Sequence, residues 1–124
     1  MSNWIHVAGN IRFDTHSDKK KDKKEIEKIF QVLGDIPEGS EGPLDIQILD
    51  VQPPTDNCVY SARYSVNIVG DLRDVQNFRP IADWVKGIKK RCIENDMWIR
   101  QGIVGAVSDR GSHKSWELLT IYKK

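Results

Sequence analysis

The sequence has little cysteine, no long apolar run and no excess of charge of either sign. Two cysteines in 124 residues are too few for a disulfide framework, so we expect reduced thiols. The 19 basic and 18 acidic side chains leave a net charge of +1, which excludes a bulk attraction for nucleic acid. No segment approaches the roughly 20 apolar residues of a membrane span, and the first residues lack a signal-peptide pattern. We therefore predict a cytoplasmic protein without a membrane segment.

The common catalytic and metal-binding spacings are also missing. The chain contains no H-E-x-x-H, C-x-x-C, Walker or G-x-G-x-x-G motif and no nucleophile elbow. Asp14, His16 and Asp18 form a D-x-H-x-D cluster that could hold a divalent ion, but a polar loop is the better interpretation. We predict no metal, no cofactor and no enzymatic activity.

Hydrophobic periodicity predicts five strands and two helices. Alternating patterns indicate strands over residues 4–13, 44–51, 59–69, 98–107 and 116–123. A helical stripe joins Ile26, Ile29, Phe30 and Leu33, and Gly34 is placed to end that helix. A second stripe joins Phe78, Ile81, Ala82, Val85, Ile88 and Cys92, with Pro80 in the first turn and the helix start between residues 74 and 77. Turns are expected at 36–43, 52–57, 70–74 and 108–114.

This order predicts one α+β domain over residues 1–124. The arrangement is a ferredoxin-like βαββαβ fold with an extra C-terminal β-strand, in which two helices cover one face of an antiparallel sheet. The other face is then uncovered. Gly9, inside the first strand, indicates a bulge or a close backbone approach.

The uncovered face is expected to mix aromatic, basic and amide side chains. Its members are Trp4, His6, Asn10, Arg12, Arg63, Asn67, Trp98 and Arg100. Such a mixture can stack bases and hold phosphates, whereas exposed tryptophans on a sheet also mark contacts between subunits. We favour a second copy of the chain over a ligand, and the two are compatible because ligand sites often lie between subunits.

Three turns are candidate anion sites, because glycine and serine expose backbone N–H groups there. They are GSEG (39–42), GDLRD (70–74) and SDRGS (108–112), and two of them carry Arg73 and Arg110. If a nucleotide-like anion binds, Trp4 or Trp98 would stack its base. The predicted ligand-binding residues are Trp4, His6, Arg12, Arg63, Arg73, Trp98, Arg100 and Arg110.

A run of lysines precedes the first helix, in HSDKKKDKKEIEKIF (16–30). The start of a helix prefers acids, so five cations at Lys19–Lys24 do not serve helix stability. One interpretation starts the helix near Asp22 or Lys24 and leaves Lys19–Lys21 in a solvated loop. The alternatives are a contact patch for phosphate or an acidic protein, or an aid to solubility.

Several short motifs resemble landmarks of small, uncharacterised proteins encoded by bacteriophages and prophages. They are WIHV (4–7), GSEG (39–42), GDLRD (70–74), WIRQ (98–101) and Trp116, and they span nearly the whole chain. The lysine run and the PPT turn have no counterpart in that resemblance. The group has no established activity, so the resemblance implies a genetic setting, the cytoplasm of a bacterial host, rather than a mechanism.

Three functions follow as hypotheses. The first is a homo-oligomeric phage accessory protein, an anti-defence factor that sequesters a nucleotide-like signal or blocks a host defence protein. The second is a single-stranded nucleic-acid-binding protein that uses the same face and Lys19–Lys24. The third is a small nuclease or phosphodiesterase with His6 or His16 as general base.

Overall fold

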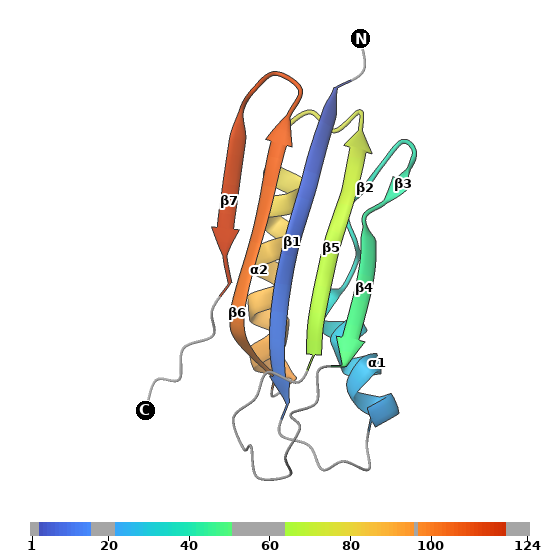
Figure 1. Cartoon of the computed structure of the whole chain (residues 1–124), viewed down its shortest axis with the longest axis vertical. Coiled ribbons are helices and arrows are strands. Elements are labelled where there is room, and N and C mark those ends of the chain that lie inside the picture. The colour runs from blue at the N-terminus through green and yellow to red at the C-terminus, as the bar shows by residue number, and fades with distance from the viewer. Residues whose placement is uncertain (1–2, 16–21, 51–63, 96, 119–124) are drawn as a thin grey trace.

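The computed structural model of the chain describes residues 3–15, 22–50, 64–95 and 97–118. It is an α+β fold with a five-stranded antiparallel sheet in the order β4-β5-β1-β6-β7 (Figure 1). A separate two-stranded hairpin pairs β2 with β3. In chain order the elements are β1 (Trp4–Thr15), α1 (Asp22–Leu33), β2 (Glu38–Gly39), β3 (Gly42–Pro43), β4 (Asp45–Asp50), β5 (Tyr64–Arg73), α2 (Arg79–Glu94), β6 (Met97–Ser108) and β7 (His113–Glu117).

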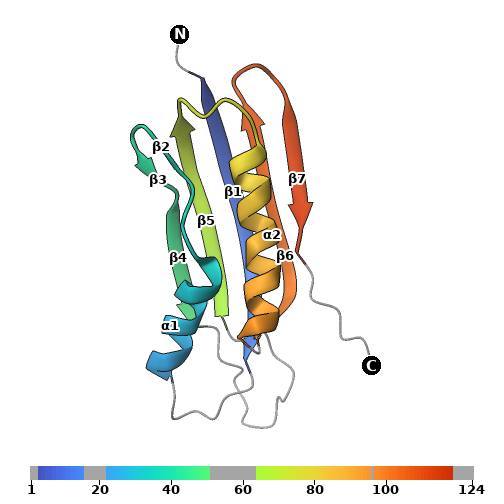
Figure 2. The same ribbon diagram turned by 180° about the vertical axis from the view of Figure 1, so that it is seen from behind.

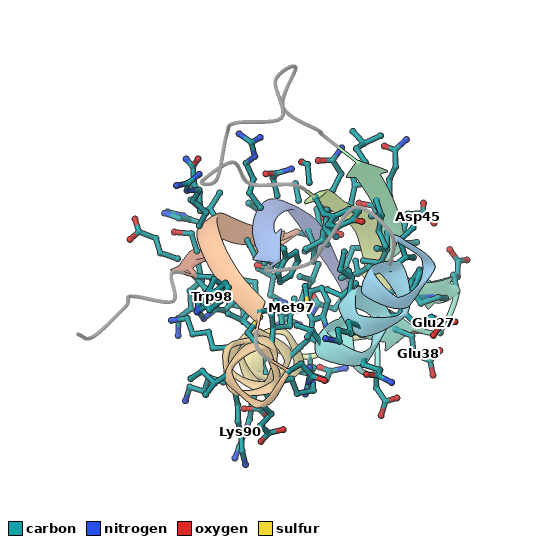
Figure 3. All side chains as sticks on the ribbon, turned by 90° about the horizontal axis from the view of Figure 1, so that it is seen from below. Glu27, Glu38, Asp45, Lys90, Met97 and Trp98 are labelled. Atoms are coloured by element: carbon teal, nitrogen blue, oxygen red, sulfur yellow. The ribbon has the colours of Figure 1, made fainter. Side chains whose placement is uncertain are left out.

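Both helices lie on one face of the sheet, as predicted. Figure 2 shows α2 running along β1 and β6 and α1 lying beside β4 and β5. The view along the strands in Figure 3 places the two helices together on one side. No described element covers the opposite face, which is turned toward the viewer in Figure 1. Neither described helix is long and apolar enough to cross a bilayer.

Strand β1 is the centre of the sheet and supplies the core through its odd-numbered residues. It pairs with β5 on one edge and with β6 on the other. Four of its side chains are at most 3% exposed: Ile5, Val7, Ile11 and Phe13. Gly9 lies on the same face. A β-carbon there would come within 2.6 Å of the carbonyl oxygen of Ile103, so Gly9 marks a close backbone approach.

A bulge in β6 corrects the predicted face of that strand. Arg12 pairs with Gln101 and Phe13 pairs with Ile99, so Arg100 has no opposite residue on β1. The extra residue shifts the in-and-out alternation of side chains along β6 by one position. Ile99 is therefore buried, whereas Ile103 lies on the open face and is 51% exposed. Simple alternation along residues 98–107 predicts that Ile99, Ile103 and Val107 share one face, and the bulge makes that prediction wrong.

The helical stripes are partly as predicted. In α1 Ile29 and Leu33 are buried, but Phe30 is 53% exposed and Val32 takes its place in the core. Ile26 is also exposed, and Figure 2 shows the start of α1 extending past the ends of β4 and β5. The structure adds another buried residue to α2. Its buried side chains are Ile81, Trp84, Val85, Ile88 and Cys92, while Phe78 and Ala82 are only half-buried.

Two predicted turns are shorter than expected. Residues 70–73 belong to β5, and the turn begins at Asp74, whose φ of 63° is left-handed. The β6–β7 turn spans only 109–112, because the N–H of Ser108 donates to the carbonyl of Ser112 at 2.8 Å. Strand β7 thus begins three residues before the predicted start, at His113. Residues 51–63 and 119–124, with the predicted PPT turn and the end of the last strand, lie outside the described residues.

The last turn of α1 is held by side chains of α2. The indole N–H of Trp84 donates to the carbonyl of Leu33 at 2.7 Å. Arg91 donates from Nε to the carbonyl of Val32 at 2.7 Å and from Nη2 to that of Leu33 at 3.0 Å. Gly34, at φ 64°, ends the helix in the predicted left-handed conformation. These bonds satisfy carbonyls that a helix end leaves unpaired and lock the two helices together.

We expect Arg91→Ala to lower the free energy of unfolding by about 1–3 kcal/mol, because two charge-assisted hydrogen bonds to helix carbonyls are lost. Lys90→Ala is the matched control, since Lys90 points away from the sheet (Figure 3). Urea unfolding followed by circular dichroism measures both variants. Equal stability of the two variants would contradict a capping role for Arg91.

Candidate functional site

The open face presents the even-numbered residues of β1 together with their register partners. Across the strands they form rows: Trp4 with Arg73; His6 with Asp71 and Val107; Ala8 with Val69 and Gly105; Asn10 with Asn67 and Ile103; and Arg12 with Ser65 and Gln101. Strand β7 adds His113 opposite Val107, Ser115 opposite Gly105 and Glu117 opposite Ile103. The middle of this face is apolar on the three inner strands, at Ala8, Val69, Gly105, Ile103 and Val107. It is polar at Asn10 and Asn67, and the outer strands add the charged residues Asp45 and Glu117.

A hollow of about 530 Å³ occupies the middle of the open face. Ala8 and Gly105 lie next to each other in its floor, because they are register partners with little or no side chain. Val69 and Val107 stand beside them and are about half exposed. We call this space the central hollow. An exposed concavity lined by apolar groups is the usual setting of a ligand or partner contact.

One end of the face is built around His6. Its Nδ1 lies 2.7 Å from Oδ1 of Asp71 on β5, and its Nε2 lies 2.7 Å from Oδ1 of Asp109 in the β6–β7 turn. The imidazole therefore bridges two carboxylates and ties β1 to both neighbours. These hydrogen bonds, first to Asp71 and then to Asp109, raise the pKa of His6 above its ordinary value. We call these three residues the acidic end.

This arrangement alters the roles predicted for His6. A general base needs a free ring nitrogen, and both nitrogens of His6 are engaged. The two carboxylates approach opposite nitrogens of the ring, so the three side chains do not converge on one metal position. Within the described part of the chain, no group of three or more His, Cys, Asp or Glu side chains could hold a metal ion. His6 acts here as a structural link between two acidic side chains.

Trp4 and Arg73, two predicted ligand residues, contact each other. The Arg73 guanidinium carbon lies 5.8 Å from the centre of the Trp4 ring, and its Nη1 forms an ion pair with Glu41 at 3.1 Å. One face of the indole is thus covered by a cation that already has a carboxylate partner. Stacking of a base on Trp4, with Arg73 on its phosphate, would require both contacts to break.

In each of the three predicted anion turns, a backbone N–H group donates to a carbonyl oxygen of the protein: those of Ser40, Asp74 and Asp109. The N–H of Ser40 in GSEG donates to the carbonyl of Arg73 at 3.0 Å, and its hydroxyl donates to Asp74 at 2.8 Å. GSEG and GDLRD are therefore in contact, with carboxylates around them. In the third turn the N–H of Asp109 donates to the carbonyl of Trp4 at 3.1 Å. Their surroundings do not favour an anion, and Arg110 is an exposed residue of this last turn.

The opposite end of the face carries the remaining predicted residues. Arg12 lies beside Gln101, and Trp98 pairs with Asp14 between the buried residues Met97 and Ile99. Arg100 is exposed at the bulge. The Nε atom of Arg12 is buried and has no hydrogen-bond partner among the described residues. We call Arg12 and Arg100 the basic end.

Seven of the eight predicted ligand residues are described, and these seven form two groups rather than one site. Trp4, His6, Arg73 and Arg110 lie at or near the acidic end, whereas Arg12, Trp98 and Arg100 lie at the other. Arg12 lies six positions after His6 on β1, a distance of roughly 20 Å at the rise of a strand. One mononucleotide cannot reach both groups. Arg63 lies outside the described residues.

The lysine run is only partly described. Helix α1 begins at Asp22, which agrees with the interpretation that the helix starts after Lys19–Lys21. Those three lysines, with His16 and Asp18 of the D-x-H-x-D cluster, lie outside the described residues, so a contact role for them stays a prediction.

Sequence reasoning missed the residues that dominate the open face. Asp71 and Asp109 were expected only as parts of turns, and Val69, Ile103 and Val107 were expected in the core or left unassigned. One signal was available for Val69: it alternates with buried Ile68, so it had to face away from the helices. Burial raises the pKa of the Cys92 thiol to about 12, which excludes this cysteine as a nucleophile.

No protein-family model matches the chain, and neither curated proteins nor solved structures give a match. The resemblance to phage-encoded proteins therefore stays a prediction.

We expect His6→Gln to destabilise the protein in a pH-dependent manner. Because the folded pKa of His6 is raised, the stability it contributes is fully present below about pH 6.5 and is lost as pH rises through the folded pKa. The difference in melting temperature between wild type and variant should be largest near pH 5.5 and should shrink at alkaline pH. His113→Gln is the control, because His113 lies on the same face without a carboxylate partner among the described residues. A difference independent of pH would show that His6 acts through shape alone.

Proposed function

We propose that the protein is a non-enzymatic binding protein whose open sheet face is the binding surface. The observation that carries this proposal is the apolar centre of that face. Val69 and Val107 line the central hollow and are 55% and 48% exposed, and Ile103, two residues from Gly105 on the same face, is 51% exposed. Scattered exposed apolar side chains are common, but several gathered around a concavity mark an interaction site.

The state of His6 supports binding over catalysis. The only described histidine that contacts carboxylates has both ring nitrogens engaged, so it is poorly placed to accept a proton from a substrate. The third hypothesis, a nuclease or phosphodiesterase with His6 or His16 as general base, loses one of its two candidate bases. His16 lies outside the described residues.

We infer a ferredoxin-like arrangement for the domain. Its support is the sheet order β4-β5-β1-β6 with antiparallel pairing throughout, together with a helix after β1 and another after β5. In this interpretation β7 is the extra C-terminal strand, which extends the sheet beside β6. The arrangement places both helices on one face and so accounts for the open one.

The biological setting that we propose is a phage or prophage, on the strength of the WIHV, GSEG, GDLRD and WIRQ landmarks. In that setting a protein without a catalytic group would act by occupancy, either blocking a host defence protein or sequestering a nucleotide-like signal. The broad apolar face suits a macromolecular contact, because it is wider than the footprint of a small polar ligand.

A second candidate function is binding of a nucleotide-like anion or a single nucleic-acid strand at the basic end. One observation favours it: the buried Nε of Arg12 has no hydrogen-bond partner among the described residues. A phosphate oxygen would supply that partner, and the nearby Trp98 could stack a base. The acidic end would take no part, because its carboxylates repel phosphate.

The binding function is tested by native mass spectrometry of protein purified from cells. We expect wild type to carry mass beyond a single chain and Val107→Asp to lose it, since a carboxylate beside the central hollow would be desolvated in any contact. Ile93→Asp is the matched control, because Ile93 is 74% exposed on α2, away from the open face. A bare single chain for wild type would contradict the proposal.

The anion function is tested by titrating nucleoside triphosphates and a short single strand while following tryptophan fluorescence. We expect Arg12→Ala to weaken binding by about tenfold, the effect of one charge-assisted hydrogen bond. Arg110→Ala, a change at the far end of the face, should leave affinity unchanged. Equal losses in both variants would indicate a diffuse charge effect and no site at the basic end.

A further inference from the structure

The central hollow and the residue next to it have complementary shapes on the same strand. Gly105 in the floor has no side chain, and a β-carbon there would meet only the carbonyl oxygen of Ala8, at 3.8 Å. Two residues earlier on β6, Ile103 projects from the same face and is 51% exposed. The face thus carries a projecting side chain, Ile103, next to an unfilled space above Gly105, which we call the hole.

We propose that a second copy of this chain packs face to face on the open sheet, with Ile103 of each subunit seated over Gly105 of the other. This inference rests on the proposed function and names the partner of that surface. Contacts in a two-fold dimer are reciprocal, so a face that carries both halves of one contact is suited to bind itself. Face-to-face packing of two sheets is a common way of burying apolar sheet faces.

The register of the sheet selects the direction of the two-fold axis. When two sheets pack face to face, the axis lies in the plane between them, either along the strands or across them. An axis across the strands at the level of Gly9 places the row of Ala8 and Gly105 against the partner's row of Asn10 and Ile103. The same operation places the row of His6 and Asp71 against the partner's row of Arg12.

Charge favours the same axis. His6 with Asp71 and Asp109 forms the acidic end, and Arg12 with Arg100 forms the basic end, roughly 20 Å away along β1. The axis across the strands places the acidic end of each subunit against the basic end of the other. The axis along the strands would place carboxylates against carboxylates and guanidinium groups against guanidinium groups, which is unfavourable in a desolvated contact.

The area of the face is adequate for a dimer. Five strands of five to twelve residues, spaced about 4.8 Å apart with a rise of about 3.3 Å per residue, cover roughly 700 Å² per subunit. Two such faces together bury roughly 1,400 Å², toward the lower limit of stable, specific interfaces. The predicted dimer is therefore of moderate affinity and sensitive to single changes at its centre.

Sedimentation equilibrium of purified wild type and two central variants tests the contact. We expect wild type to be dimeric, and Ile103→Glu and Gly105→Val each to raise the dimer Kd roughly thirtyfold or more, as at other interface centres. Gly105→Val fills the hole where the fold has room for a side chain, so the variant monomer should keep the wild-type circular dichroism spectrum. Ile93→Glu should leave the dimer intact.

A mixing experiment tests the axis itself. Alone, Arg12→Asp and Asp71→Arg should each be monomeric, because each places like charges against each other across the interface. Mixed in equal amounts, they should form a heterodimer with a Kd at least tenfold below that of either variant alone, because both contacts then join opposite charges. No heterodimer from folded variants would overturn the proposed axis.

The outcomes separate this inference from the proposed function. A monomeric wild type that carries another mass, lost in Val107→Asp, overturns the dimer and leaves the open face as a binding surface for that partner. A dimer that survives Ile103→Glu and Gly105→Val overturns the proposed contact. A bare monomer overturns both the dimer and the binding function.

Discussion

The alternation of side chains along β1 is the constraint on which the rest of the structure depends. As the central strand, β1 pairs along both edges, so its register sets the face on which the side chains of β5 and β6 lie. Its odd-numbered residues enter the core under the helices, and its even-numbered residues form the open face. A slip of one residue would place Phe13 in solvent and Arg12 under a helix, so the core and the candidate site are specified together.

Two helices are enough to cover one face of this sheet and no more. The consequence is a second face on which Val69, Ile103 and Val107 remain about half exposed. Apolar area that stays exposed does not stabilise the folded single chain, because apolar surface lowers the free energy only when it is removed from water. Polar side chains at these positions would serve a lone monomer equally well. The apolar centre is therefore better explained by a contact than by the fold.

Much of this fold could be predicted from local patterns, whereas the site depends on pairings that those patterns do not contain. Apolar side chains that recur at every second residue predicted β1 and β5, and apolar side chains that recur about every 3.6 residues predicted both helices. The bulge at Arg100 was not predictable, because it arises from pairing with β1 and leaves no local signal. The contacts of His6 join it to residues 65 and 103 positions away, at distances that a linear sequence does not show. Val32 replaced Phe30 in the core because the path of a short helix over a sheet is set by tertiary packing.

The positions of charged and apolar side chains on β1 and its two neighbouring strands explain what each part contributes to binding. Charged groups at the rim of an interface add little affinity, but they choose the partner and its orientation. The apolar centre supplies the affinity and has little directional preference of its own. Here the carboxylates beside His6 and the guanidinium group of Arg12 lie at opposite ends of one strand, with the central hollow between them. A partner with the reverse polarity along its length is selected over one of uniform charge. An inverted copy of the same face has that polarity, because each end of the strand then meets its opposite.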